Sequence, residues 1–341
     1  MRHLMPATSA VLASLCFTLP ACHAADSAPP TYKLTGSVAL GGPERWDFVY
    51  FDAVSKRVYV SHRTHVDVVD ATQNKVVGQV TGIGESHGVV TVPSLGRGYA
   101  DDAAAKAVVV FDLKTLARIA TVPVGIDADA MAYDPATGRG FVMNADGHSV
   151  SAIDARTDRA LETVPLGGAP EVAAADGHGK LFINIASTNE IAVFDTAKLA
   201  ITARWPVSAC EKPHGMAMDE ARGRLFVSCI NARMLVLDSQ SGRILTDLPI
   251  GKGTDSAAFD PARKLAFSSN GDGTLSIISE RDADTFENAG ELKTAVGART
   301  MAVDADTGRV FLVAADVDPS AQSKSRAYIA NSTKLLILER R

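Results

Sequence analysis

The sequence predicts an all-β fold, a seven-bladed β-propeller made of four-stranded antiparallel blades. An acidic turn residue returns every 40 to 44 positions, with Val92 in its place in the second repeat: Asp52, Asp134, Asp176, Asp219, Asp260 and Asp304. A second register of acids, spaced by 41 to 43 residues, comprises Asp70, Asp112, Asp154, Asp195, Asp238 and Glu280. A period of about 40–45 residues is typical of propeller blades. Two registers with one period make coincidence a poor explanation.

Residues 212 to 251 show how each repeat is built. A short apolar strand leads into a turn rich in Asp, Gly and Arg, and a second strand follows at 225 to 227. A third strand ends on Asp238, and residues 244 to 251 supply a fourth. Apolar runs bounded by turn residues are strand signals. The last copy ends at Glu339, 59 residues after Glu280, because residues 316 to 333 form an insertion, and it brings the number of repeats to seven.

The two ends of the chain are expected to close the ring. The seventh repeat stops after its third strand, so its blade lacks an outer strand. Residues 32 to 41 resemble the outer-strand segments 119 to 125 and 244 to 251. The N-terminal strand is therefore predicted to complete the last blade, which removes an open sheet edge.

The chain begins with the pattern of a secretory signal peptide, namely Arg2, an apolar run at 11 to 19 and a small-residue exit at Ala24. Cleavage after Ala24 gives a signal peptide (1–24), a flexible leader (25–31) and one propeller domain (32–341). The mature protein is then expected to be periplasmic or secreted. A second interpretation is a lipobox at 19 to 22, which would leave Cys22 lipid-anchored. No later apolar run approaches the roughly 20 residues of a transmembrane helix.

The charge balance narrows the class of partner. Without residues 1 to 24, which contain one arginine and no acid, the chain carries 33 basic and 39 acidic side chains. This balance disfavours nucleic acid, because proteins that bind phosphate backbones usually carry a basic patch. A small molecule or a partner protein at the channel face is the expected partner, and we expect a monomer.

The second strands carry a family resemblance. They read Tyr-Val-Ser-His at 59 to 62, Phe-Val-Met-Asn at 141 to 144 and Phe-Val-Ser-Cys at 226 to 229. Over residues 32 to 341 the chain resembles the YVTN-type seven-bladed β-propeller repeat proteins, an exported bacterial family. The resemblance implies the fold. Members of this family are similar to propellers with different activities: some bind cofactors, some are enzymes, and some bind nucleic acid or proteins. The resemblance therefore does not indicate one function, which must be argued from a site.

Alignment of the repeats finds one ionisable residue per blade, five positions before each turn residue: Asp47, His87, Asp129, Glu171, His214, Asp255 and Arg299. Innermost strands line the channel of a propeller, so these side chains should ring one of its mouths. Four carboxylates and two histidines there would repel one another unless a cation or a cationic ligand lies between them. The alternative is a solvated, ion-paired ring, with Arg299 bonded to Asp47 or Asp255.

Histidines gather on the same predicted face, where five of the six mature ones fall: His62, His65, His87, His148 and His214. Imidazole and carboxylate together suit zinc, copper, iron or nickel. We expect His87 and His214, helped by Asp129, Glu171 and Asp255, to hold a metal or a cationic part of a ligand. Because the two histidines lie three blades apart, we expect a larger ligand or a metal-bearing cofactor more than a bare ion, with Arg299 placed for a carboxylate or phosphate on it. His65 and His148, in loops, are expected to be solvated.

Catalytic motifs are missing from the sequence, which has no GxSxG elbow, Walker loop or dinucleotide fingerprint. The enzymatic alternative is a lyase or lactonase that uses His87 or His214 as general base. A non-catalytic scaffold for a partner protein is the third class.

Cys210 and Cys229, the only mature cysteines, are expected to form a disulfide, because exported proteins meet an oxidising environment. Pairing of the first two strands about the 219 to 224 turn would place Cys229 opposite His214. A thiolate metal site is the alternative to the disulfide.

Overall fold

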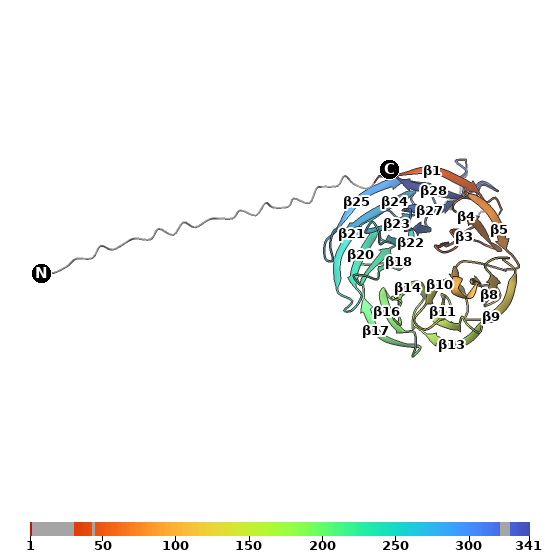
Figure 1. Ribbon diagram of the computed structural model, residues 1–341, viewed down its shortest axis with the longest axis horizontal. Coiled ribbons are helices and arrows are strands. Elements are labelled where there is room, and N and C mark those ends of the chain that lie inside the picture. Colours follow the sequence, from red (N-terminus) through yellow and green to blue (C-terminus); the bar gives the residue numbers. More distant parts are fainter. Residues whose placement is uncertain (2–30, 43–44, 321–327) are drawn as a thin grey trace.

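The computed structural model describes residues 1, 31–42, 45–320 and 328–341. Seven four-stranded antiparallel sheets follow one another around a ring, each sheet forming one blade (Figure 1). The predicted all-β class, the number of blades and the strands per blade are confirmed. The one helical element among the described residues is a single 3₁₀ turn, η1 (Pro93–Leu95).

Blades 1 to 4 take their four strands in chain order from the innermost outward. Blade 1 contains β2 (Val49–Asp52), β3 (Arg57–His62), β4 (His65–Asp70) and β5 (Lys75–Val80). Blade 2 contains β6 (Val89–Val92), β7 (Arg97–Asp102), β8 (Ala107–Asp112) and β9 (Arg118–Pro123). Blade 3 contains β10 (Ala128–Asp134), β11 (Arg139–Asn144), β12 (Ser149–Asp154) and β13 (Arg159–Pro165). Blade 4 contains β14 (Pro170–Ala175), β15 (Lys180–Ile185), β16 (Glu190–Asp195) and β17 (Ala200–Pro206).

Blades 5 and 6 repeat this order, and blade 7 departs from it in its outer strand. Blade 5 contains β18 (Pro213–Asp219), β19 (Arg224–Cys229), β20 (Arg233–Asp238) and β21 (Ile244–Pro249). Blade 6 contains β22 (Thr254–Asp260), β23 (Leu265–Asn270), β24 (Thr274–Glu280) and β25 (Phe286–Lys293). Blade 7 contains β26 (Met301–Asp304), β27 (Arg309–Ala314), β28 (Lys334–Arg340) and β1 (Tyr32–Ala39).

An aromatic ring in every second strand supplies much of the packing between blades. These rings are at most 2% exposed and occupy equivalent strand positions: Tyr59, Tyr99, Phe141, Phe182, Phe226, Phe267 and Phe311. Phe226 stacks on Phe259 of blade 6 with ring centroids 5.1 Å apart, and Phe311 stacks on Phe51 of blade 1 at 5.6 Å. Buried aromatic side chains contribute the largest apolar area per residue. Each blade therefore depends on its neighbours for its core.

The repeating acids cap the turns at the end of the ring away from the predicted site. Oδ1 of Asp52 accepts a hydrogen bond from the amide of Val54 at 3.0 Å, and Oδ1 of Asp70 accepts one from Thr72 at 2.8 Å. Aspartate side chains commonly bond their own backbone two residues on. Where Val92 replaces the acid, the chain turns instead through η1 and Gly96, whose φ is 67°. Turn capping thus explains both registers of acids except at Glu280, whose carboxylate accepts a hydrogen bond from Arg222 at 3.0 Å instead.

The N-terminal strand closes the ring, as the sequence predicted. β1 pairs antiparallel with β28, from Tyr32 opposite Arg340 to Ala39 opposite Lys334. Figure 1 shows β1 at the rim, outside β28 and next to the C-terminus. Tyr32 is buried and meets Phe267 of blade 6 edge-on at 5.5 Å. The closing strand therefore adds core contacts as well as backbone hydrogen bonds.

The predicted signal peptide and nearly all of the leader fall on residues 2–30, outside the described residues. Within the described ranges, no helix is long and apolar enough to span a membrane.

The structure contains the disulfide between Cys210 and Cys229, both fully buried in blade 5. The register expected around it was wrong by one residue. Cys229 lies opposite Pro213, not His214, because the pairing of β18 with β19 shifts between Pro213 and Met216. The bridge therefore fastens the loop that enters β18 to the end of β19.

We predict that Tyr32→Ala lowers the free energy of unfolding by about 3 kcal/mol, because it removes a buried ring from the closing strand. Tyr32→Phe is the matched control. The Tyr32 hydroxyl is buried with no hydrogen-bond partner among the described residues, so its removal should change stability by less than about 1 kcal/mol. Denaturant unfolding of both variants measures the difference. Equal losses in the two variants would contradict a packing role for the ring.

Candidate functional site

Bulges at the starts of the inner strands place the predicted ring residues. In four blades the pairing of the innermost strand with its neighbour shifts at the ring position, which is occupied by Asp129, Glu171, His214 or Asp255. A β-bulge inserts an extra residue and re-aims its side chain. Asp47, His87 and Arg299 lie two residues before β2, β6 and β26. A bulge therefore aims the ring residue in those four blades, whereas in blades 1, 2 and 7 it comes from the segment just before the inner strand.

His87 lies between two carboxylates of the ring. Its Nδ1 is 2.8 Å from Oδ2 of Asp47 in blade 1 and 3.9 Å from Oδ1 of Asp129 in blade 3. One ligand atom from each of these three residues lies within 4.8 Å of the others. The three side chains are between 18 and 25% exposed. The predicted residues of blades 1, 2 and 3 thus form one contiguous group.

His214 repeats this arrangement in blades 4, 5 and 6. Its Nδ1 is 3.0 Å from Oδ1 of Asp255 and 3.7 Å from Oε2 of Glu171. Nε of Arg299 is 2.8 Å from Oδ2 of Asp255, which selects Asp255 from the two partners that the sequence allowed. The seven residues therefore form two histidine-centred groups, with Arg299 attached to the second.

Burial and neighbouring charges shift the ionisation of this ring. Burial raises the pKa of Asp47 and, more strongly, that of Asp129. Burial also raises the pKa of Glu171 to about 7. Burial alone would lower the pKa of His87, but the hydrogen bond to Asp47 and the charges of nearby acids outweigh it and raise the pKa to about 9. His87 is therefore protonated at neutral pH.

The histidines thus place positive charge between the acids of the ring. The pKa of His214 is also raised, since the hydrogen bond to Asp255 and the charge of Glu171 outweigh its burial. With Arg299 on Asp255, each acid of the ring has a cationic neighbour or a raised pKa. His87 and His214 belong to separate groups, so the geometry does not bring them together on one small ion.

Sequence reasoning missed Asp101, which lies behind His87 on β7. The side chain is fully buried, and its Oδ1 accepts hydrogen bonds from the amides of His87 and Gly88 at 2.7 and 2.9 Å. Burial raises its pKa well above the ordinary value. Asp101 fixes the backbone that carries His87. Comparison of second strands could have found it, since Ser61 and Ser228 occupy the equivalent positions of blades 1 and 5.

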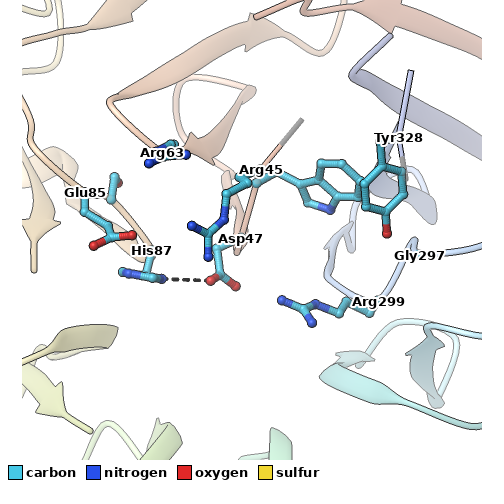
Figure 2. Close-up of a pocket in the computed structure, with 10 residues that line it drawn as sticks. Arg45, Asp47, Arg63, Glu85, His87, Gly297, Arg299 and Tyr328 are labelled. Carbon is cyan, nitrogen blue, oxygen red and sulfur yellow. Dashed lines mark hydrogen bonds and ion pairs between the residues drawn. The ribbon is translucent and has the colours of Figure 1, made fainter. Parts of the chain in front are cut away.

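A pocket of about 210 Å³ opens beside the His87 group, at the junction of blades 7, 1 and 2. Its lining includes three arginines, two acids and two aromatic rings: Arg45, Trp46, Asp47, Arg63, Glu85, Ser86, His87, Gly297, Arg299 and Tyr328. Figure 2 shows the guanidinium groups of Arg45 and Arg299 turned toward the region of Asp47. The rings of Trp46 and Tyr328 form one wall, with centroids 4.9 Å apart. Tyr328 comes from the insertion after β27.

Gly297 is required in that wall. Its φ is 89°, and a Cβ built there would lie 2.5 Å from the hydroxyl oxygen of Tyr328. A side chain would therefore displace the tyrosine ring from the pocket.

The remaining histidines divide into exposed and clustered ones. His148, in the turn before β12, is exposed, as expected, and His178 lies in an exposed turn between β14 and β15. The expectation that His65 is a solvated loop residue was wrong. It begins β4, its side chain is 14% exposed, and its Nε2 is 3.5 Å from Oδ1 of Asp67.

We predict that the imidazole of His87 titrates with a midpoint near pH 9. Because the folded-state pKa lies above the ordinary 6.5, the stabilisation from protonated His87 is complete below about pH 6.5 and is lost as the pH rises through about 9. Proton NMR of the ring measures the midpoint. Asp47→Asn should lower it by at least about one unit, because it removes the anionic acceptor. A wild-type midpoint at or below 6.5 would contradict the assigned pairing.

No known protein-family model matches the chain, and no curated protein is similar to it. The geometry of the site therefore carries the functional argument.

Proposed function

We propose that this protein binds a small organic anion, a carboxylate or phosphate that carries an apolar or aromatic part, in the pocket at the channel mouth. The observation that carries the proposal is the placement of three arginines and an aromatic wall around one concavity beside the His87 group. Small-molecule sites are concave, mostly apolar and equipped with a few convergent polar groups. Such a site favours a small molecule over a partner protein.

Charge favours an anion. Three arginines and His87 line the pocket against Asp47 and Glu85, although the whole chain has a formal net charge of −5. Arg45 and Arg63 form no ion pair with any other described residue, and Arg299, 48% exposed, bonds Asp255 through Nε. The planar guanidinium group recognises carboxylate and phosphate with paired hydrogen bonds. The pocket therefore holds cationic donors that the fold itself does not neutralise.

Size and shape favour a small ligand. A volume of about 210 Å³ lies below the roughly 300–1,000 Å³ of sites for drug-sized molecules. The edge-to-face pair of Trp46 and Tyr328 offers an aromatic wall to one side of the arginines. An aromatic or short aliphatic acid matches both features.

Export is part of the proposal. The disulfide is typical of proteins that mature in oxidising compartments. Together with the signal-peptide pattern at 1–24, it supports a periplasmic or secreted protein. The expectation of a monomer stays a prediction.

We predict that benzoate binds the pocket and that benzylamine, which has the same ring and the opposite charge, does not. Titration calorimetry at pH 7 measures both. Arg63→Gln and Arg299→Gln should each weaken benzoate binding about tenfold, because each removes a charge-assisted hydrogen bond. Arg243→Gln, in the exposed turn between β20 and β21, is the matched control and should change nothing. Preferential binding of benzylamine would reverse the proposed charge of the ligand.

A lyase or lactonase is the second candidate, and Glu171 is the observation that favours it. With a pKa raised to about 7 by burial, Glu171 is suited to accept a proton at neutral pH, and His214, whose Nδ1 lies 3.7 Å from Oε2 of Glu171 and whose pKa is also raised, is suited to donate one. Hydrolysis of γ-butyrolactone, followed in a pH-stat, tests this candidate. The rate should exceed that of buffer and be lost in Glu171→Gln, and a wild-type rate equal to buffer removes the candidate.

A further inference from the structure

Blade 1 carries a compact cluster of two imidazoles and a carboxylate that the ligand pocket does not use. Nδ1 of His62 is 2.8 Å from Oδ2 of Asp67, and Nε2 of His65 is 3.5 Å from Oδ1 of Asp67. One ligand atom from each residue lies within 4.8 Å of the others. The side chains of His62 and Asp67 are 0 and 1% exposed, and that of His65 is 14% exposed. The cluster is thus buried, with one side reaching solvent.

Strand geometry brings these residues together. The hairpin between β3 and β4 pairs His62 directly with His65, and their rings lie 4.8 Å apart. Asp67 follows two residues later on β4 and therefore points to the same face as His65. Gln79 of β5 pairs with Asp67, and its amide donates a hydrogen bond to Oδ1 at 2.8 Å. Three adjacent strands thus support the cluster.

The other blades show what the fold itself needs at these positions. In blade 3 the equivalents are Asn144, Ser149 and Ser151, and the Asn144 amide donates to both serines at 3.1 and 3.0 Å. Blade 6 repeats this with Asn270, Thr274 and Ser276. None of the other six blades has histidine at any of the three positions. The remaining sets, for blades 2, 4, 5 and 7 in turn, are Asp102, Ala107 and Val109; Ile185, Glu190 and Ala192; Cys229, Arg233 and Leu235; and Ala314, Lys334 and Leu336. A neutral amide and two hydroxyls are enough to build the hairpin.

We propose that His62, His65 and Asp67 form a binding site for a divalent transition-metal ion of the zinc class. Imidazole nitrogen and carboxylate oxygen are ligands that zinc, iron and nickel accept. Zinc holds such atoms at about 2.0–2.2 Å, so two ligand atoms on one ion lie at most about 4 Å apart. Each histidine meets this limit with one oxygen of Asp67, His62 with Oδ2 at 2.8 Å and His65 with Oδ1 at 3.5 Å, so we expect the carboxylate to bind the ion through both oxygens. The remaining coordination positions stay open to water or an added ligand.

Gln79 and His65 complete the arrangement. Partners in the outer shell orient ligating carboxylates, and the hydrogen bond from Gln79 holds Asp67 in this way. The partly exposed ring of His65 gives an ion a route from solvent. The site is independent of the proposed anion pocket, because no member of the cluster lines that pocket.

Zinc titration of the mature, disulfide-bonded protein tests the proposal. The protein is stripped with EDTA, dialysed and titrated with Zn²⁺ by calorimetry, and its thermal midpoint is recorded with and without Zn²⁺. We expect one Zn²⁺ per chain and a higher midpoint in its presence. The triple variant His62→Asn, His65→Ser, Asp67→Ser, which introduces the residues of blade 3, should lose at least a hundredfold in affinity. His148→Ala, the lone histidine of the blade 3 hairpin, is the control and should bind as the wild type does.

Several outcomes would overturn the proposal: no zinc binding by the wild type, unchanged binding by the triple variant, or binding lost in His87→Gln but kept in the triple variant. The last result would assign the ion to the channel group. If the triple variant does not fold, His65→Gln replaces it, since it alters only the partly exposed ligand. It should weaken zinc binding at least tenfold, and unchanged affinity would overturn the proposal equally.

Discussion

Closure of seven interdependent blades into one ring is the constraint on which the rest of the structure depends. No blade can bury its second-strand aromatic ring alone, because each ring packs against residues of a neighbouring sheet. The seventh blade obtains its outer strand from the other end of the chain, which gives it four strands like the other six. Ring closure also fixes where equivalent residues lie. Side chains at the same position of each repeat are arranged around the ring axis, so those at the channel mouth lie close to one another.

Because the ring residues lie close together, their acidic side chains repel one another, and other residues of the same ring reduce this repulsion. Four acids at one channel mouth would repel one another, yet each histidine lies between two of them and Arg299 bonds to Asp255. Burial raises the pKa of Asp129 and Glu171, which lowers the negative charge further. The histidines, Arg299 and the raised pKa values of the acids therefore all reduce the repulsion at the mouth. The neighbouring pocket, with its arginines, is left with an excess of positive charge that a ligand can use.

The repeat pattern predicted the fold well, because turn capping and strand pairing are local and recur at a fixed period. Two registers of acids located every blade, and the position five residues before the turn located every ring residue. The bulge at His214 and the pocket were beyond the sequence for different reasons. A bulge changes register without a distinctive residue type, and the pocket combines a loop, an inter-blade turn and Tyr328 of the insertion, which no repeat alignment brings together.

The histidines of blade 1 also could not be assigned correctly from the repeat pattern. From the sequence, His62 and His65 were grouped with the channel histidines because all of them fall on the same predicted face of the propeller. In the structure, the β3–β4 hairpin pairs the two histidines with each other, and both contact Asp67. Cross-strand partners follow from the turn length, so a two-residue hairpin at 63 to 64 was the signal that could have separated the two clusters.

We expect a ligand to bind in the arginine-lined pocket and not on the axis between the carboxylates. A crystal structure with 4-bromobenzoate distinguishes the two places, because anomalous scattering locates the bromine without ambiguity. One bromine peak should lie against Trp46 and Tyr328, with the carboxylate within hydrogen-bond distance of Arg63 or Arg299. A pocket without bromine, or a ligand held only on the axis among Asp129, Glu171 and Asp255, would contradict this expectation.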